Sequence, residues 1–201
     1  EALRRVAKPE SMLARNDPSV RVLEGLPREV TQLHGETPES IVYHEGDIAL
    51  TADLRRGQKT GAFLDQAENH MLAGRLARGR VLDAFTYAGG FALAAARGAE
   101  AVTAVDTSAE ALRTARLHAE RNGLANVECV EANAFDFLKD ADHRGERYDM
   151  VILDPPAFAK NKRELEGALR GYKEINLRAM KILKPGGILL TCSCSYHLSE
   201  P

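Results

Sequence analysis

Residues with covalent and acid–base chemistry follow two apolar runs of the sequence. Residues 154–156 read Asp-Pro-Pro, and the two prolines restrict the backbone beside the carboxylate in a way that packing does not require. Cys192 and Cys194 close the second run, where strand alternation puts both side chains on one side and only Cys194 reaches the loop. A thiol there, near Asp154, is a candidate nucleophile. An inert apolar cysteine is the alternative for Cys129 and for one of this pair.

A second group of residues could bind a ligand that contains a nucleoside. Residues 83–91 leave an apolar run, carry adjacent glycines and enter a helical pattern, so the backbone could approach a ligand there. A tight turn without a ligand is the alternative, and the glycines do not follow the G-x-G-x-x-G spacing of pyrophosphate-binding turns. Asp106 closes the next run, 23 residues after Asp83, and could accept hydrogen bonds from two ribose hydroxyls or favour a helix dipole. Asn133 and Ala134 follow the third run, where the amide oxygen could accept from an adenine amino group or cap a helix.

These residues have to be positioned by regular elements, and strand and helix patterns alternate from about residue 63. The expected strands are 80–85, 101–106, 127–130, 148–153 and 188–192. The expected helices are 65–78, 90–97, 108–121, 134–139 and 163–183. This alternation predicts an α/β fold with an open, mostly parallel sheet and right-handed crossovers. Because ligands bind outside the carboxyl ends of such strands, the residues above should meet at one edge.

The first part of the chain has a different pattern. Residues 1–58 are rich in turns and are expected to form a β-rich appendage, whereas 59–201 form the sheet domain. Short strand signals, with a hairpin turn between the last two, lie at 19–23, 41–44 and 48–54.

Composition and charge narrow the classes of function. The chain has 201 residues, of which 44% are apolar and 28% charged, and it contains no apolar run long enough for a transmembrane helix. Three cysteines without Cys/His clusters predict neither a disulfide framework nor a zinc site, so a reduced, cytoplasmic protein is expected. A net charge of −2 argues against a general nucleic-acid coat and leaves room for a local basic patch. Lysines and arginines that could contact RNA, with a solvated helix face as the alternative, are Lys59, Lys160, Lys162 and Arg163.

Taken together, these motifs resemble the successive motifs of the class I S-adenosylmethionine-dependent methyltransferases: the turn at 83–91, Asp106, the pair at 133–134 and the Asp-Pro-Pro sequence. The resemblance implies the Rossmann-like sheet of that family. Segments that narrow the resemblance to RlmI-type 23S ribosomal RNA cytosine-C5 methyltransferases are 59–66, 85–91, 154–158, 170–176 and 193–195. The resemblance implies S-adenosyl-L-methionine as cofactor, 23S ribosomal RNA and a second copy of the chain as partners, and no membrane partner.

The resemblance also implies roles for individual residues. The thiolate of Cys194 would add to C6 of a flipped-out or unpaired cytosine, and Asp154 would hold the N3/N4 edge of that base. The cofactor-binding residues that it implies are Gln66, Asp83, Phe85, Tyr87, Gly89, Asp106, Asn133, Ala134 and Asp154.

The sequence departs from this family at several points and leaves other functions open. The family usually has an acidic residue at Asn133 and a basic one at Ala67, and its N-terminal PUA domain and last strands have no counterpart, so a central fragment is expected. The alternatives are a guanine-N7 RNA methyltransferase, which should lack a cysteine such as Cys194, and a cofactor-binding or scaffold fragment without activity. An NAD-dependent dehydrogenase is disfavoured by the glycine spacing.

Overall fold

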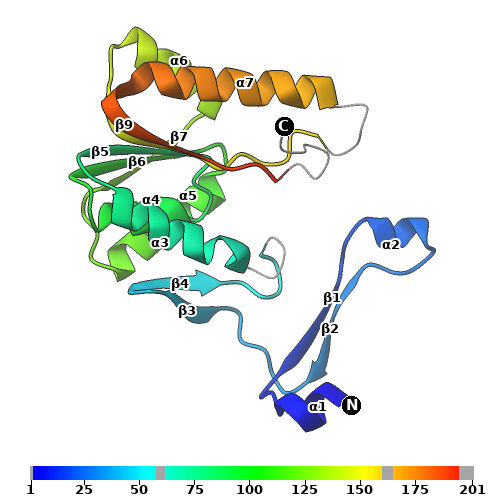
Figure 1. Cartoon of the computed structure of the whole chain (residues 1–201). Helices are drawn as coiled ribbons and strands as arrows, with labels where there is room; N and C mark the ends of the chain where they lie inside the picture. The colour runs from blue at the N-terminus through cyan, green and yellow to red at the C-terminus, as the bar shows by residue number, and fades with distance from the viewer. Residues whose placement is uncertain (1, 58–61, 160–164, 195–201) are drawn as a thin grey trace. The chain divides into compact units, whose positions relative to one another are not determined.

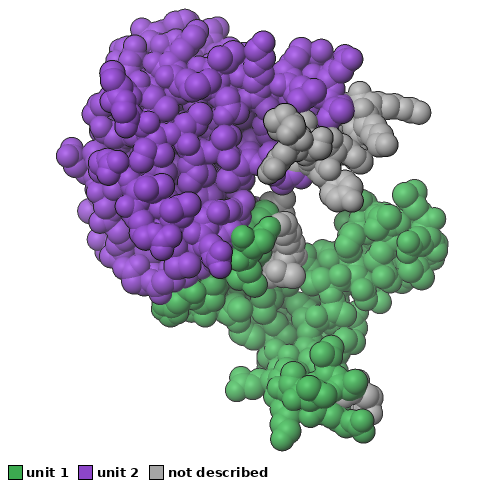
Figure 2. Space-filling model, viewed as in Figure 1, with its two compact units in different colours: residues 1–44, 49–65 green, residues 45–48, 66–201 purple. Residues whose placement is uncertain are grey.

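The computed structural model describes residues 2–57, 62–159 and 165–194. The chain divides into two compact units (Figure 2), the first made of residues 1–44 and 49–65 and the second of residues 45–48 and 66–201. The expected domain boundary at residue 58 stays a prediction.

Two small two-stranded sheets are formed by the first unit, apart from Glu45 and Ile48 at the hairpin turn, which are assigned to the second unit. Strand β1 (Met12–Asn16) pairs antiparallel with β2 (Glu29–His34), and β3 (Ile41–Glu45) pairs with β4 (Ile48–Ala52). The second pair confirms the hairpin that the sequence predicts around residues 45–47. Helix α1 (Ala2–Ala7) precedes β1.

The strand expected at residues 19–23 is wrong. These residues form the short helix α2 (Val20–Leu23), which lies in the connection between β1 and β2. The backbone N–H of Arg21 donates to the carbonyl of Pro18, and the Arg21 guanidinium donates to the carbonyl of Pro27. These local hydrogen bonds close a helical turn, which apolar alternation over five residues does not distinguish from a strand.

The second unit is built on a five-stranded sheet in which every recorded pairing is parallel, as the alternating pattern predicts. The strands, in the spatial order β7-β6-β5-β8-β9, are β5 (Arg80–Ala84), β6 (Ala101–Asp106), β7 (Val127–Glu131), β8 (Tyr148–Leu153) and β9 (Leu183–Thr191). The strand order changes direction between β5 and β8. A crevice at the carboxyl ends of such neighbouring strands is where open α/β sheets bind ligands.

Helices cover both faces of this sheet (Figure 1). They are α3 (Ala67–Leu76), α4 (Gly90–Ala96), α5 (Ala109–Arg121), α6 (Ala134–His143) and α7 (Leu165–Ile182). Leu82, Val151 and Leu153 pack with α6 and α7, whereas Val81 and Ile152 pack with α3 and α4. Neighbouring strand residues thus enter opposite cores, which explains why residues 150–153 of β8 are a continuous apolar run.

Several boundaries differ from those expected. The predicted helix 65–78 begins as a 3-10 turn (Leu64–Gln66) before α3, and the helix expected to end at residue 139 continues to His143. Strand β9 is longer than the predicted 188–192, because its pairing with β8 continues across a register shift. In the part of the chain that the structure describes, no helix is long and apolar enough to span a bilayer.

Candidate functional site

The turn between β5 and α4 has the most constrained backbone of the site. Phe85 (φ 75°) and Tyr87 (φ 51°) both lie in the left-handed region, which costs side-chain-bearing residues about 1–3 kcal/mol each. Gly89 also has positive φ (91°), and its N–H donates to the carbonyl of Thr86 at 2.9 Å. The N–H groups of Phe85 and Thr86 both donate to the carbonyl of Val105 on β6, at 2.9 Å each. The turn is therefore held in one shape by the neighbouring strand.

Asp83 is fully buried beneath this turn. Its Oδ2 accepts a hydrogen bond from the Thr86 hydroxyl at 2.6 Å, whereas its Oδ1 has no hydrogen-bond partner among the described residues. Burial raises the pKa of Asp83 to about 7; the Thr86 hydrogen bond, the charge of His70 and, most weakly, the backbone N–H of Ala92 oppose this rise, and the charge of Asp154 adds to it. A buried carboxylate oxygen without a donor is costly unless a ligand supplies one.

Asp106, at the end of β6, organises the backbone around it. Its Oδ2 accepts from the N–H of Tyr87 and its Oδ1 from the N–H of Ser108, both at 2.9 Å. A carboxylate has about four acceptor positions, so both oxygens keep capacity for ribose hydroxyls. The expected ribose contact is therefore compatible with the structure, and Asp106 also has a second, structural role in the turn.

Asn133 serves as the N-cap of α6. Its side-chain oxygen accepts from the N–H of Phe135 at 2.9 Å and of Asp136 at 3.4 Å, so the alternative of a helix cap describes what this oxygen does. Ala134 is buried at the first position of the helix. An adenine contact at these two residues stays a prediction.

Asp154 lies directly after β8, half-buried, and is held by a residue from another segment. The Gln66 side-chain amide donates to its Oδ2 at 3.2 Å, and Gln66 in turn accepts from the Asn69 amide at 2.6 Å. The structure thus brings together Gln66 and Asp154, two predicted site residues that are 88 positions apart.

The three cysteines have different surroundings. The exposed Cys194 places its Sγ 3.6 Å from the carbonyl oxygen of Pro155, the residue that follows Asp154. Cys192 is half-buried, and burial together with the charges of Asp154 and Asp83 raises its pKa to about 12. Burial also raises the pKa of Cys129. Because the thiolate is the nucleophilic form, Cys192 and Cys129 are poorly suited to covalent chemistry.

An aromatic cluster at the same edge was not predicted as a unit. The ring centroids of Phe158 and Tyr172 are 4.6 Å apart, those of Phe135 and Phe158 5.8 Å, and those of Phe85 and Phe135 6.4 Å. All four side chains are partly buried. They come from four separate segments of the chain. The sequence could have predicted the cluster only from the positions of these residues, which lie just after strands or on a helix that packs on the sheet.

His70 was also missed, since the six scattered histidines of the sequence show no motif. It is buried on α3, its Nδ1 lies 2.5 Å from Glu45 Oε2, and its ring packs edge-on against Phe91 with centroids 4.4 Å apart. A Cβ at Gly90 would overlap this ring, so the glycine permits close packing of α4 on α3. The residues predicted to contact RNA, Lys59, Lys160, Lys162 and Arg163, lie outside the described residues.

The strand order and the polar residues at the strand ends are those expected of an α/β protein with a site for a nucleoside-containing cofactor at the carboxyl edge of its sheet. Comparison with known proteins agrees with this class. Residues 26–199 match the model of a family described as S-adenosylmethionine-dependent methyltransferases. The chain belongs to this family, whose cofactor is S-adenosylmethionine.

Similar proteins include two called "Ribosomal RNA large subunit methyltransferase I". The Photobacterium profundum protein is 48% identical over 190 residues, which cover 92% of this chain and 48% of that protein. The Aeromonas salmonicida protein is 43% identical over 200 residues, which cover 97% of this chain and 50% of that protein. The chain therefore spans about half the length of these relatives.

Two solved structures show the same fold. The methyltransferase SMU.776, solved with S-adenosylhomocysteine, is 31% identical with a TM-score of 0.74, and the match covers 85% of this chain and 46% of that one. A methyltransferase from Agrobacterium tumefaciens has a TM-score of 0.78 at 20% identity over 98% of this chain and 63% of that one.

The residues of the site fit the family's cofactor. S-adenosylmethionine carries an ammonium group, ribose hydroxyls and an adenine ring. The buried Oδ1 of Asp83 lacks a donor, and the oxygens of Asp106 keep free acceptor positions. The turn that contains Gly89 places a backbone of fixed conformation next to these carboxylates.

Proposed function

We propose that this chain carries the methyl-transferring site of an RNA methyltransferase that acts on large-subunit (23S) ribosomal RNA, at C5 of cytosine, through a covalent adduct with Cys194. The names of its relatives support the RNA substrate. The observation that carries the cytosine chemistry is the Cys194 thiol, which is exposed and lies 3.6 Å from the carbonyl oxygen of Pro155, the residue after Asp154.

A thiol at this position would solve the chemical problem of the reaction. C5 of cytosine is a weak nucleophile, and addition of the Cys194 thiolate to C6 moves electron density onto C5. S-adenosylmethionine, when bound, supplies an electrophilic methyl group. Afterwards a base removes the C5 proton, the C6–S bond breaks, and the thiolate is free again.

Asp154 is suited to hold the target base. A carboxylate at the N3/N4 edge of cytosine accepts a hydrogen bond from the N4 amino group and stabilises positive charge that develops at N3. The hydrogen bond from Gln66 limits the rotation of this carboxylate, which keeps it in place before the base arrives. The base must be flipped out or unpaired to reach these groups.

Calorimetric titration of the 201-residue chain with S-adenosylhomocysteine, with NAD as control, tests the cofactor part of the proposal. Binding of S-adenosylhomocysteine alone in the micromolar range is expected. NAD binding instead would overturn the assignment, and binding of neither by a folded chain would favour the scaffold alternative.

Trapping with 5-fluorocytidine RNA tests the covalent step. Fluorine at C5 cannot leave as a proton does, so the adduct persists and is seen as a mass shift of the chain. We expect the adduct in wild type and in Cys192→Ala, and none in Cys194→Ala. An adduct in Cys194→Ala would overturn the role of this residue, and methylation of guanine without any adduct would favour the guanine-N7 alternative.

A further inference from the structure

A basic pocket lies in the first compact unit, formed by α1, the residues that follow it and the end of β2. Its lining residues, which include no acidic side chain, are Arg4, Arg5, Lys8, Pro9 and His34, and its volume is about 490 Å³. The side chains of Arg4, Arg5 and Lys8 are exposed, and none of them has a hydrogen bond or ion pair to another described residue. We propose that this pocket is a docking surface for the phosphate backbone of single-stranded RNA.

The pocket is built by fixed backbone contacts. Gly35, directly after β2, has φ 56°, and a Cβ there would overlap the carbonyl oxygen of Glu10. His34 is paired with Met12 of β1, so the end of β2 lies against the segment that follows α1. Lys8 itself has positive φ (43°). These contacts fix the backbone from which His34 and Lys8 line the same pocket.

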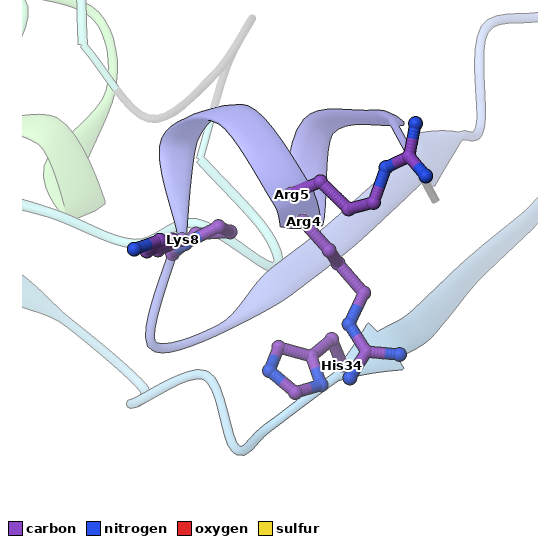
Figure 3. A pocket seen from close by; sticks show the side chains of 5 residues that line it. Arg4, Arg5, Lys8 and His34 are labelled. Carbon is purple, nitrogen blue, oxygen red and sulfur yellow. The ribbon is translucent and has the colours of Figure 1, made fainter.

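The directions of the side chains favour a ligand whose charges are spread along a chain. In Figure 3 the Arg4 guanidinium reaches toward the His34 ring, whereas the side chains of Arg5 and Lys8 point to different sides of the helix. Cations that do not converge suit a row of phosphates better than one small anion. Arginine forms bidentate hydrogen bonds with phosphate, and guanidinium and imidazole planes both stack on unpaired bases.

The overall charge agrees with a local surface of this kind. The chain has a net charge of −2, so RNA would not be held by its surface as a whole. The pocket differs from this overall charge, because four basic side chains and no carboxylate line it. This inference rests on the proposed RNA substrate but concerns a surface separate from the Cys194 site.

The experiment compares the wild-type chain with Arg4→Gln/Arg5→Gln/Lys8→Gln by fluorescence anisotropy, using a labelled single-stranded RNA of mixed sequence as the probe. If three phosphate contacts are lost, the slope of log K against log salt should fall by about 2. The affinity gap between wild type and variant should then narrow roughly 20-fold between about 50 and about 200 mM salt. Arg4 and Arg5 are exposed on α1, a helix without buried residues, and Lys8 is exposed directly after it, so the fold should persist.

Two controls make the test specific. Arg78→Gln/Arg113→Gln/Arg121→Gln removes the same charge from exposed arginines of the second unit and should leave the salt slope nearly unchanged. An equal fall in this control would overturn the inference, as would wild-type affinity in the Arg4/Arg5/Lys8 variant. Loss of affinity for polyglutamate, with RNA affinity unchanged, would identify an acidic protein as partner and overturn it as well.

Binding of S-adenosylhomocysteine separates this inference from the proposed function. The Arg4/Arg5/Lys8 variant should bind S-adenosylhomocysteine as wild type does, because its substitutions lie outside the cofactor site. If RNA binding is weakened in the Arg4/Arg5/Lys8 variant but no Cys194 adduct forms, the inference is upheld and the proposed cytosine chemistry is wrong. If a Cys194 adduct forms but the Arg4/Arg5/Lys8 variant binds RNA as tightly as wild type, the proposed chemistry is upheld and the inference about the basic pocket is wrong.

Discussion

Replacement of the buried Asp83 by Asn should remove a pH-dependent loss of stability from the free protein and at the same time weaken cofactor binding. The pKa of Asp83 rises from 3.8 to about 7 on folding, which corresponds to about 4 kcal/mol at 1.36 kcal/mol per unit. Between pH 4 and 7 the unfolded chain has released a proton that the folded chain still holds. The free energy of unfolding therefore falls as the pH rises through this window, and it stays at the lower level above pH 7.

An asparagine at this position does not titrate, so the free energy of unfolding of the variant does not fall for this reason as the pH rises. Terms that do not depend on pH, such as the cost of a buried amide without a partner, cancel when the variant is compared with wild type at two pH values. From pH 5 to pH 8 the free energy of unfolding of Asp83→Asn, relative to wild type, should rise by about 3 kcal/mol.

Cofactor binding should respond in the opposite sense. The ionised carboxylate is the form that pairs with an ammonium group, so below pH 7 wild type must lose a proton on binding. Its affinity for S-adenosylhomocysteine should be roughly tenfold lower at pH 6 than at pH 8, since one pH unit below the pKa costs a factor of ten. Asp83→Asn should bind weakly at both pH values.

Urea titrations at pH 5 and pH 8 measure the first effect, and calorimetry at pH 6 and pH 8 measures the second. Asp136→Asn, which removes an exposed carboxylate from the first turn of α6, is the control for loss of one negative charge. A relative stability of Asp83→Asn that is the same at pH 5 and pH 8 would refute the reasoning. Tight cofactor binding by this variant would refute the role of Asp83 in the site.

Three further substitutions or reagents test other parts of the site. His70→Ala removes a buried ring and leaves the Glu45 carboxylate without its partner, so urea titration should show a loss of about 3 kcal/mol; unchanged stability would contradict this. Asn133→Ala removes the cap of α6 and should cost about 1 kcal/mol, whereas Asn133→Ser should retain most of the stability, as measured by thermal unfolding. Iodoacetamide at pH 8 should modify Cys194 well before Cys192, whose pKa is about 12, and equal rates in mass spectrometry would argue against the assignment of the nucleophile.

The sheet domain could be predicted from the sequence because its signals are local and repeated. Residues 150–153 of β8 are all apolar, and Ser108 and the Asn122-Gly123 pair mark the two ends of α5. The Ser108 hydroxyl accepts from the N–H of Ala111, as an N-cap does. In the first unit the signals are weak, and β1 and β2 were not predicted, because neither strand contains a buried residue. Without a buried face, alternation in the sequence has no reason to appear.

The candidate site could be predicted only in part, for a physical reason. Asp83, Asp106 and Asp154 follow strands, and the topology of a parallel sheet brings strand ends together whatever the intervening sequence. Contacts that depend on side-chain packing, such as those of His70 with Glu45 and of Phe158 with Tyr172, do not follow from the topology of the sheet. They become visible only when helices from distant segments are placed against the sheet.

The turn after β5 shows how the sheet order creates the site. Left-handed conformations at Phe85 and Tyr87 are unfavourable by themselves, and they persist because several groups fix them together. Strand β6 accepts two backbone N–H groups of the turn at Val105 and a third at Asp106. Helix α5 adds the imidazole Nδ1 of His118, 3.0 Å from the carbonyl of Ala88. Because β6 and α5 supply these contacts before any ligand binds, the energy of cofactor binding need not be spent on shaping the turn.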